Sequence, residues 1–149
     1  DGLTAVEAAE DQPTYQVWEF DKDTEQHIQF CVPMPRNYNN GTITATFYWT
    51  STGSGDVVWG ISGRAFSNDD ALAQAFGTVV EVTDTLTAAS DVCVSSETAA
   101  ITLAGSPADA DMWQCQIDRV VGAGGDDLNA DARLLSIVIH YTTDSAVSG

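Results

Sequence analysis

Two histidines and a surplus of carboxylates are the side chains of this sequence that offer acid–base chemistry. General acid–base or nucleophilic catalysis needs a base held beside its partner. His27 and His140 are the only histidines; they lie far apart in the chain, and no G-x-S-x-G or Cys–His motif surrounds either. We therefore expect ordinary strand histidines and no hydrolase or transferase activity.

Two acidic clusters have the spacing of hard oxygen ligands for a cation. The first comprises Asp21, Asp23 and Glu25, and the second comprises Asp126, Asp127 and Asp131. In the first, the Gly and Glu that a calcium loop requires at its sixth and twelfth positions are absent. Solvated turns are the expected structures, so no metal or other cofactor is assigned. A metal site at either cluster is the alternative.

Four tryptophans raise the question of glycan binding, because sugars stack on exposed aromatic faces. Trp49 and Trp59 share the apolar rows of their strands, which favours packing in the core. Trp18 and Trp113 are less determined by their neighbours. They are the candidate glycan-binding residues.

Composition excludes several classes of partner. The chain has 149 residues, 44% of them apolar, with 22 Asp and Glu against 5 Lys and Arg, for a net charge of −17. This length suits one domain with a sizeable core. The charge repels phosphate backbones and anionic lipid surfaces, so neither a nucleic acid nor a membrane is an expected partner. No apolar run approaches the ~20 residues of a membrane span.

The three cysteines, Cys31, Cys93 and Cys115, match no zinc-binding spacing. An odd number leaves at least one thiol unpaired within a monomer. We expect three free thiols and folding in a reducing cytoplasm, with one disulfide as the alternative.

Short alternating segments separated by Gly, Asp, Asn and Pro turns predict an all-β fold. The expected strands are 15–20, 27–32, 42–50, 56–66, 78–83, 91–102 with an interruption at Ser95-Ser96, 111–120 and 134–142. A short helix is expected at 69–76, capped by Ser67 or Asn68 and ended by Gly77. Residues 1–13 are expected to form a loosely held N-terminal arm, and 14–149 a single antiparallel β-sandwich domain of about eight strands.

The last expected strand, 134–142, has apolar side chains on both faces. Such a strand is central in its sheet, or it presents one face to another subunit. In the second case Leu134, Val138 and His140 are the candidate contact residues.

The segments YQVWEFDKDTEQHIQFCVPMP, GTITATFYWT, GDVVWGISGRAFSNDDALAQAFG, DMWQCQIDRV and DARLLSIVIHYTTD, taken together, resemble small virion proteins of tailed bacteriophages. The resemblance covers roughly residues 15–144. It implies a jelly-roll module that decorates a capsid or forms a head or tail fibre. Its expected partners are copies of itself, commonly as a trimer, and phage capsid or tail proteins, with association through strand surfaces and the arm at 1–13. The implied location is the virion. The alternative function is a glycan- or receptor-binding tail-fibre module.

Overall fold

A computed structural model describes residues 3–7 and 14–143, with side chains described over 15–142. The described residues contain nine strands and no helix. The strands are β1 (Leu3–Glu7), β2 (Thr14–Phe20), β3 (Gln26–Pro33), β4 (Tyr38–Thr50), β5 (Asp56–Phe66), β6 (Val80–Thr85), β7 (Cys93–Val94), β8 (Met112–Arg119) and β9 (Ala132–Thr143). No described helix is long and apolar enough to cross a membrane.

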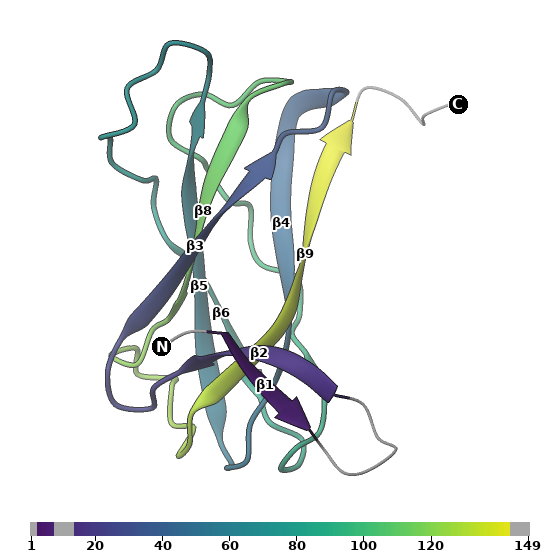
Figure 1. The fold of residues 1–149 in the computed structure, drawn as a ribbon, viewed down its shortest axis with the longest axis vertical. Coiled ribbons are helices and arrows are strands. Elements are labelled where there is room, and N and C mark those ends of the chain that lie inside the picture. Colours follow the sequence, from purple (N-terminus) through teal and green to yellow (C-terminus); the bar gives the residue numbers. More distant parts are fainter. Residues whose placement is uncertain (1–2, 8–13, 144–149) are drawn as a thin grey trace.

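The strands form two antiparallel sheets that face each other (Figure 1). One sheet has the order β1-β2-β9-β4-β7 and the other the order β3-β8-β5-β6. Apart from the short β1, this is a sandwich of two four-stranded sheets, which confirms the predicted all-β class. From β2 to β9 the chain changes sheet at every connection except the one between β5 and β6.

Aromatic side chains from both sheets fill the core. The Trp59 ring stacks on Phe47 with 5.7 Å between centroids, and it meets Phe20 edge to face at 5.1 Å. Trp49 also packs against Trp59, and its Nε1 donates a hydrogen bond of 2.7 Å to Oδ2 of Asp84. Both predicted core tryptophans are fully buried. The Trp49 N–H thus keeps a hydrogen bond in the core, whereas Nε1 of Trp59 is buried without a hydrogen-bond partner.

The predicted helix at 69–76 is wrong. Asp69 has a φ of +74°, and the Ser67 N–H donates to Asp70 Oδ2 at 2.8 Å, so the expected cap is a tight turn. The backbone of the following loop bonds to β5: Arg64 Nη1 donates to the Ala75 carbonyl at 3.0 Å. Leu72, expected on the buried stripe, is 73% exposed. An eight-residue segment without a packed apolar face cannot offset the cost of helix nucleation.

The predicted strand over 91–102 is a strand only at Cys93–Val94. Beyond it the segment still follows β4, because Ser95 and Thr98 donate backbone N–H groups to the Phe47 and Ala45 carbonyls, each at 2.9 Å. The two hydroxyls in turn accept the N–H groups of Phe47 and Ala45 at 3.0 and 3.1 Å. Side-chain hydroxyls therefore replace backbone carbonyls along this edge, which is why no regular ladder forms.

β4 begins at Tyr38, within an Asn-rich stretch and earlier than the strand predicted over 42–50. Its pairing with β9 is irregular between Tyr38 and Ile43, and Asn40 adopts a positive φ of 61°. Asparagine tolerates this left-handed conformation better than most residues. The stretch therefore bends the strand without ending it.

A β-bulge in β9 changes which side chains face the core. Tyr48 pairs with Ser136 and Trp49 with Leu134, so Leu135 is left without a partner on β4. One extra residue reverses the alternation of side chains. Leu134 accordingly points into the core and is 3% exposed.

Residues 3–7 of the expected N-terminal arm form β1, which pairs antiparallel with β2. The rest of that arm lies outside the described residues.

Candidate functional site

The acidic cluster after β2 builds a turn. Asp21 Oδ1 accepts the N–H groups of Asp23 and Thr24 at 2.7 and 2.9 Å, and these hydrogen bonds lower the pKa of Asp21. Asp23 forms an exposed ion pair with Lys22 at 2.6 Å, and Glu25 is exposed. One carboxylate oxygen of each aspartate, Asp21 Oδ1 and Asp23 Oδ2, therefore already binds protein donors.

The second acidic cluster is also occupied by protein donors. Asp126 binds the Arg119 guanidinium through both carboxylate oxygens, at 2.8 and 3.1 Å. Asp127 accepts the Asp56 N–H at 2.7 Å, and Asp131 accepts a more exposed backbone N–H at 3.1 Å. In the part of the chain that the structure describes, no three His, Cys, Asp or Glu residues gather as metal ligands.

Trp113 cannot serve as a glycan platform, because it is fully buried. On β8 it shares the inward row with Cys115 and Ile117, which are also fully buried. Burial raises the pKa of the Cys115 thiol to about 12. All three cysteines are free, and Cys31 alone is exposed.

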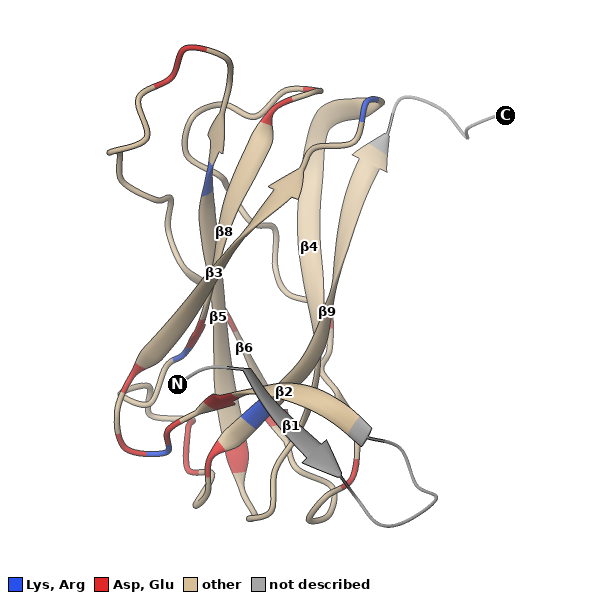
Figure 2. Cartoon of the chain, viewed as in Figure 1, with Lys and Arg blue, Asp and Glu red and all other residues tan. Residues whose placement is uncertain are grey.

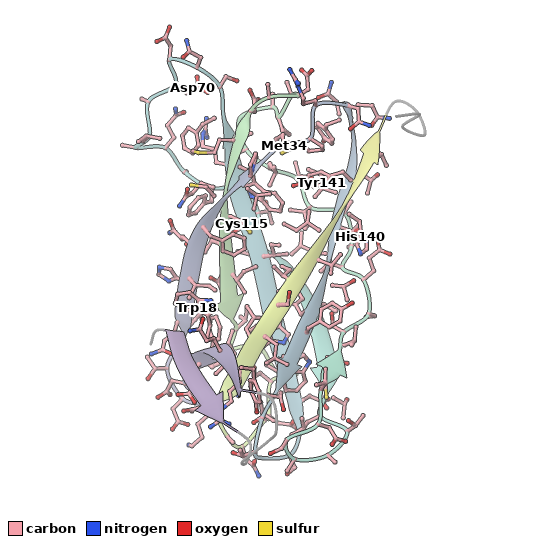
Figure 3. The ribbon with its side chains drawn as sticks, turned by 45° about the vertical axis from the view of Figure 1, so that its right-hand side comes forward. Trp18, Met34, Asp70, Cys115, His140 and Tyr141 are labelled. Carbon is pink, nitrogen blue, oxygen red and sulfur yellow. The ribbon has the colours of Figure 1, made fainter. Side chains whose placement is uncertain are left out.

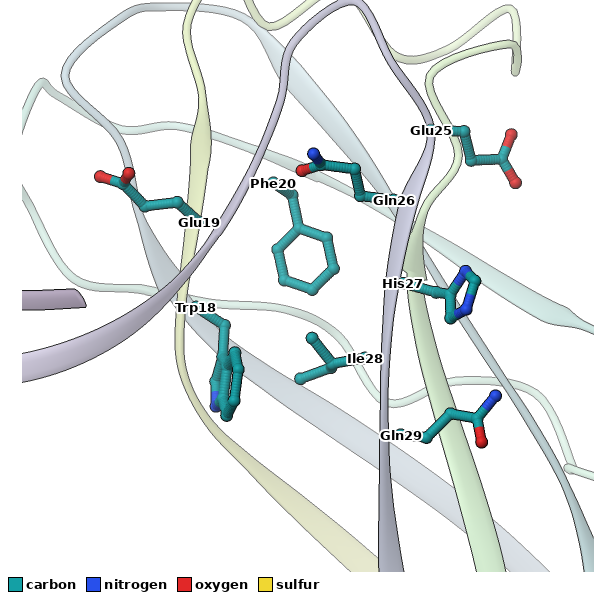
Figure 4. Close-up of a pocket in the computed structure, with 8 residues that line it drawn as sticks. All are labelled: Trp18, Glu19, Phe20, Glu25, Gln26, His27, Ile28 and Gln29. Carbon is teal, nitrogen blue, oxygen red and sulfur yellow. The ribbon is translucent and has the colours of Figure 1, made fainter. Parts of the chain in front are cut away.

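Trp18 is 37% exposed and lines a cleft of about 510 Å³ where β2 passes the free edge of β3 (Figure 4). Buried Phe20 and half-buried Ile28 lie on the apolar side of this cleft. Glu19, on its rim, is held by Arg133 at 3.1 Å. An indole can stack on a sugar ring, and the carboxylate and amide groups beside it can bind the sugar hydroxyls.

A ladder of glutamines crosses from β3 to β8 on the outer face of their sheet. Gln114 Nε2 donates to Gln29 Oε1 at 3.2 Å, and Gln29 Nε2 donates to Gln116 Oε1 at 2.9 Å. Below the ladder lies Asp118, which is 6% exposed and has one oxygen, Oδ1, without a hydrogen-bond partner. Burial raises the pKa of Asp118, an effect that His27 on the neighbouring strand opposes. The sequence signal for this face was the alternation of Gln with apolar residues.

The predicted contact residues of β9 are divided by the bulge. Leu134 belongs to the core, which corrects its assignment as a surface contact. Val138 and His140 are exposed on the outer face of their sheet, where His140 Nε2 lies 3.4 Å from the Thr46 hydroxyl. His27 lies on the outer face of the opposite sheet, so the two histidines are not brought together.

One side of the sandwich is open, between β3 and the upper part of β9. β3 is the last strand of its sheet, and β2 pairs with β9 only from Ala132 to Leu134. Half-buried apolar side chains extend along this side, and we call them the seam. The seam comprises Ile28, Phe30, Val32, Ile137, Ile139 and Tyr141. Figure 3 shows Tyr141 and His140 on opposite sides of β9, with Trp18 at the lower end of the open side.

Charge is distributed unevenly over the molecule. No residue of 26–33, 38–50 or 134–143 is Asp, Glu, Lys or Arg. Figure 2 shows these stretches as uncharged lengths of β3, β4 and β9, with acidic residues concentrated in the loops below and in the upper left loop. The strands beside the open side thus carry none of the surplus negative charge.

Comparison of the chain with protein-family models, with curated proteins and with solved structures finds no match.

Proposed function

We propose that this protein is a structural component of a tailed-phage virion, a capsid decoration or head-fibre protein that assembles from copies of itself as a trimer. The sequence resemblance supports the virion role. The strand order supports a jelly-roll arrangement: β2-β9-β4-β7 faces β3-β8-β5-β6, a pairing that two Greek keys in succession produce. Phage capsid or tail proteins are the remaining partners.

The uneven distribution of charge is the observation that carries the proposal. Copies with a net charge of −17 repel one another. Screening confines that repulsion to about 10 Å at 0.1 M salt, so contacts must keep carboxylates apart. Burying an unpaired carboxylate in an interface is costly, whereas uncharged strand surfaces avoid this cost. Strands β3 and β9 beyond Arg133 provide such surfaces, whereas Glu97 contacts Thr44 on the outer face of β4.

The arrangement of the histidines and acids supports a structural role over a catalytic one. The two histidines lie on opposite outer faces, and Asp21, Asp126 and Asp127 bind protein donors. The proposal therefore assigns no reaction and no cofactor to the chain.

Two measurements test this function. Immunogold labelling and mass spectrometry of purified particles should locate the chain on the virion surface. Sedimentation velocity should show an association that strengthens as salt is raised, because screening reduces repulsion. A chain that is absent from particles and monomeric in infected cells would refute the proposal.

A second candidate function is glycan binding, which the exposed Trp18 in its cleft favours. A glycan array should then give a signal that Trp18→Ala abolishes. Leu72→Ala, which removes a 73% exposed side chain elsewhere, is the matched control. A signal that survives Trp18→Ala, or no signal at all, would reject this site.

A further inference from the structure

We infer that the open side of the sandwich is the surface through which copies of this chain bind one another, with the β3 edge of one copy against the β9 edge of the next. The seams of the copies then meet around a common axis. This inference rests on the proposed self-association and identifies its surface.

The first argument comes from the edges of the sheets. A free edge presents unpaired N–H and C=O groups, and monomeric proteins shield such edges with charges, bulges, short strands or covering loops. β6 carries Glu81 and Asp84, and β7 has only two residues. The outer edge of β4 beyond β7 is covered by Ser95 and Thr98.

β3 is neither short, charged nor bulged, and β8 is its one partner among the described strands, although Pro33 lies at its end. It is eight residues long, uncharged, and pairs with β8 without a break in register from Gln26 to Pro33. β9 is likewise uncharged beyond Arg133, and between Leu134 and its end it has no described partner on the side away from β4. Two long unprotected edges therefore border the same opening.

The second argument comes from burial. The inward side chains of β8, in the middle of the same sheet as β3, are fully buried. The corresponding side chains of β3, Ile28, Phe30 and Val32, are only half-buried, as are Ile137 and Ile139 across the opening. A contiguous row of half-covered apolar groups is typical of an interaction surface. Its burial would supply the hydrophobic gain on association.

The third argument identifies the partner as another copy of the chain. The strands that border the open side, β3 and β9 beyond Arg133, are uncharged in a protein that repels its own copies elsewhere, so two copies can approach closely along them. If β3 of one copy paired with β3 of a second copy, the β9 edge of each copy would remain open. Pairing β3 with β9 of the next copy uses both edges, and such head-to-tail contacts close into a ring when the rotation allows. In the proposed trimer the seams of three copies would face the axis.

Gln29→Lys tests the edge, with Gln116→Lys as the matched control. Gln29 is on the edge strand, whereas Gln116 is its hydrogen-bonded partner on the central strand β8. Each change reduces the net charge from −17 to −16, so general repulsion decreases equally in both variants. A lysine on this edge strand should still weaken association at least about tenfold, as measured by sedimentation velocity. Gln116→Lys should associate like the wild type or slightly better.

Val32→Thr tests the seam without changing charge. Its control is Val79→Thr, because Val79 is 40% exposed on the segment before β6 and outside the seam. Val32→Thr should weaken association and Val79→Thr should not. Melting curves of all four variants establish that each chain is folded.

Hydrogen exchange as a function of protein concentration locates the contact directly. Association should slow exchange at 26–33 and 135–143 and leave β6 unchanged. Slowed exchange confined to other strands, together with normal association of Gln29→Lys and Val32→Thr, would overturn this inference but leave self-association intact. A chain that stays monomeric at all concentrations and salts would overturn both.

Discussion

Removal of the Asp126 carboxylate should be among the most damaging single changes in this fold. The Arg119 side chain is 0% exposed and that of Asp126 is 2% exposed. Among the described residues, Asp126 is the acid that lies within hydrogen-bond distance of Arg119. Besides this pair, the guanidinium donates to the carbonyls of Leu128 and Ala130 at 3.0 and 2.9 Å. Asp126→Ala leaves a buried cation with carbonyl dipoles as its remaining partners.

The expected cost follows from that burial. Breaking a buried ion pair by removing one partner costs about 3–5 kcal/mol. A domain of this size loses about 2–4 °C of melting temperature per kcal/mol, so the expected decrease is roughly 6–20 °C. Asp126 also accepts the Val58 N–H at 3.0 Å, and this lost bond adds to the effect.

The matched control is Glu19→Ala, which breaks the pair with Arg133. Those side chains are 31% and 26% exposed, so the expected loss is below about 1 kcal/mol. Both variants are measured by urea unfolding and calorimetry against the wild type. The reasoning is that burial determines how much an ion pair contributes to the free energy of unfolding. Equal decreases in that free energy for the two variants, or a decrease below about 1 kcal/mol for Asp126→Ala, would refute it.

Three further changes have definite expected outcomes. Gly63→Ala places a methyl group into the Trp113 indole nitrogen and should cost about 1–3 kcal/mol in urea unfolding, whereas Gly124→Ala, with nothing within 4 Å, should cost much less; similar losses in both would contradict the packing argument. In the native protein a thiol reagent should modify Cys31 alone, and the two buried thiols only after denaturant is added; rapid reaction of more than one thiol would show that the core opens readily. Asp118 has a raised pKa, so the folded chain holds that proton more tightly than the unfolded chain, and ionisation lowers stability as the pH rises through the folded pKa. Asp118→Asn should therefore melt higher than the wild type at neutral pH, with the difference lost below the ordinary pKa of an aspartate; a variant that melts lower at neutral pH would show that the carboxylate stabilises the fold.

The sequence predicts those strands in which apolar and polar residues alternate, or in which β-branched and aromatic residues form a long run. Residues 27–32 fall within β3, where burial alternates along the strand as period-two patterning requires. Residues 56–66 coincide with β5, which is buried on both faces and was indicated by its run of apolar and small residues. The same alternation predicts that Trp113 is buried, because Cys115 and Ile117 lie on the same side of the strand and are apolar. The assignment of Trp113 to glycan binding was wrong because it considered the size of the ring and not the apolar residues on the same side of the strand.

Other features depend on contacts that a local pattern does not contain. The segment 69–76 has capping residues and an apolar spacing, yet Arg64 of β5 binds the Ala75 carbonyl and the Gln74 side chain. Its local hydrogen bonds, such as that from the Gln74 N–H to the Leu72 carbonyl, are not helical ones. The bulge at Leu135 has no sequence signal, because the residues around it are apolar on both faces of the strand. The sequence therefore could not predict that the Leu134 side chain faces the core. The cleft at Trp18 forms only when β2 and β3 are brought together from different sheets.

The hydroxyl groups of Ser95 and Thr98 have a consequence for the dimensions of any assembly. Because they satisfy the N–H groups of β4, they close the sheet on the side opposite the open edge. A subunit with adhesive edges at both ends of a sheet adds further copies without limit and grows into a filament. Here the edge of β4 is covered, so copies join only through β3 and β9, and closure of those contacts into a ring fixes the number of copies. Replacing both hydroxyls with alanine would add a third adhesive edge, and fibril formation would be its visible result.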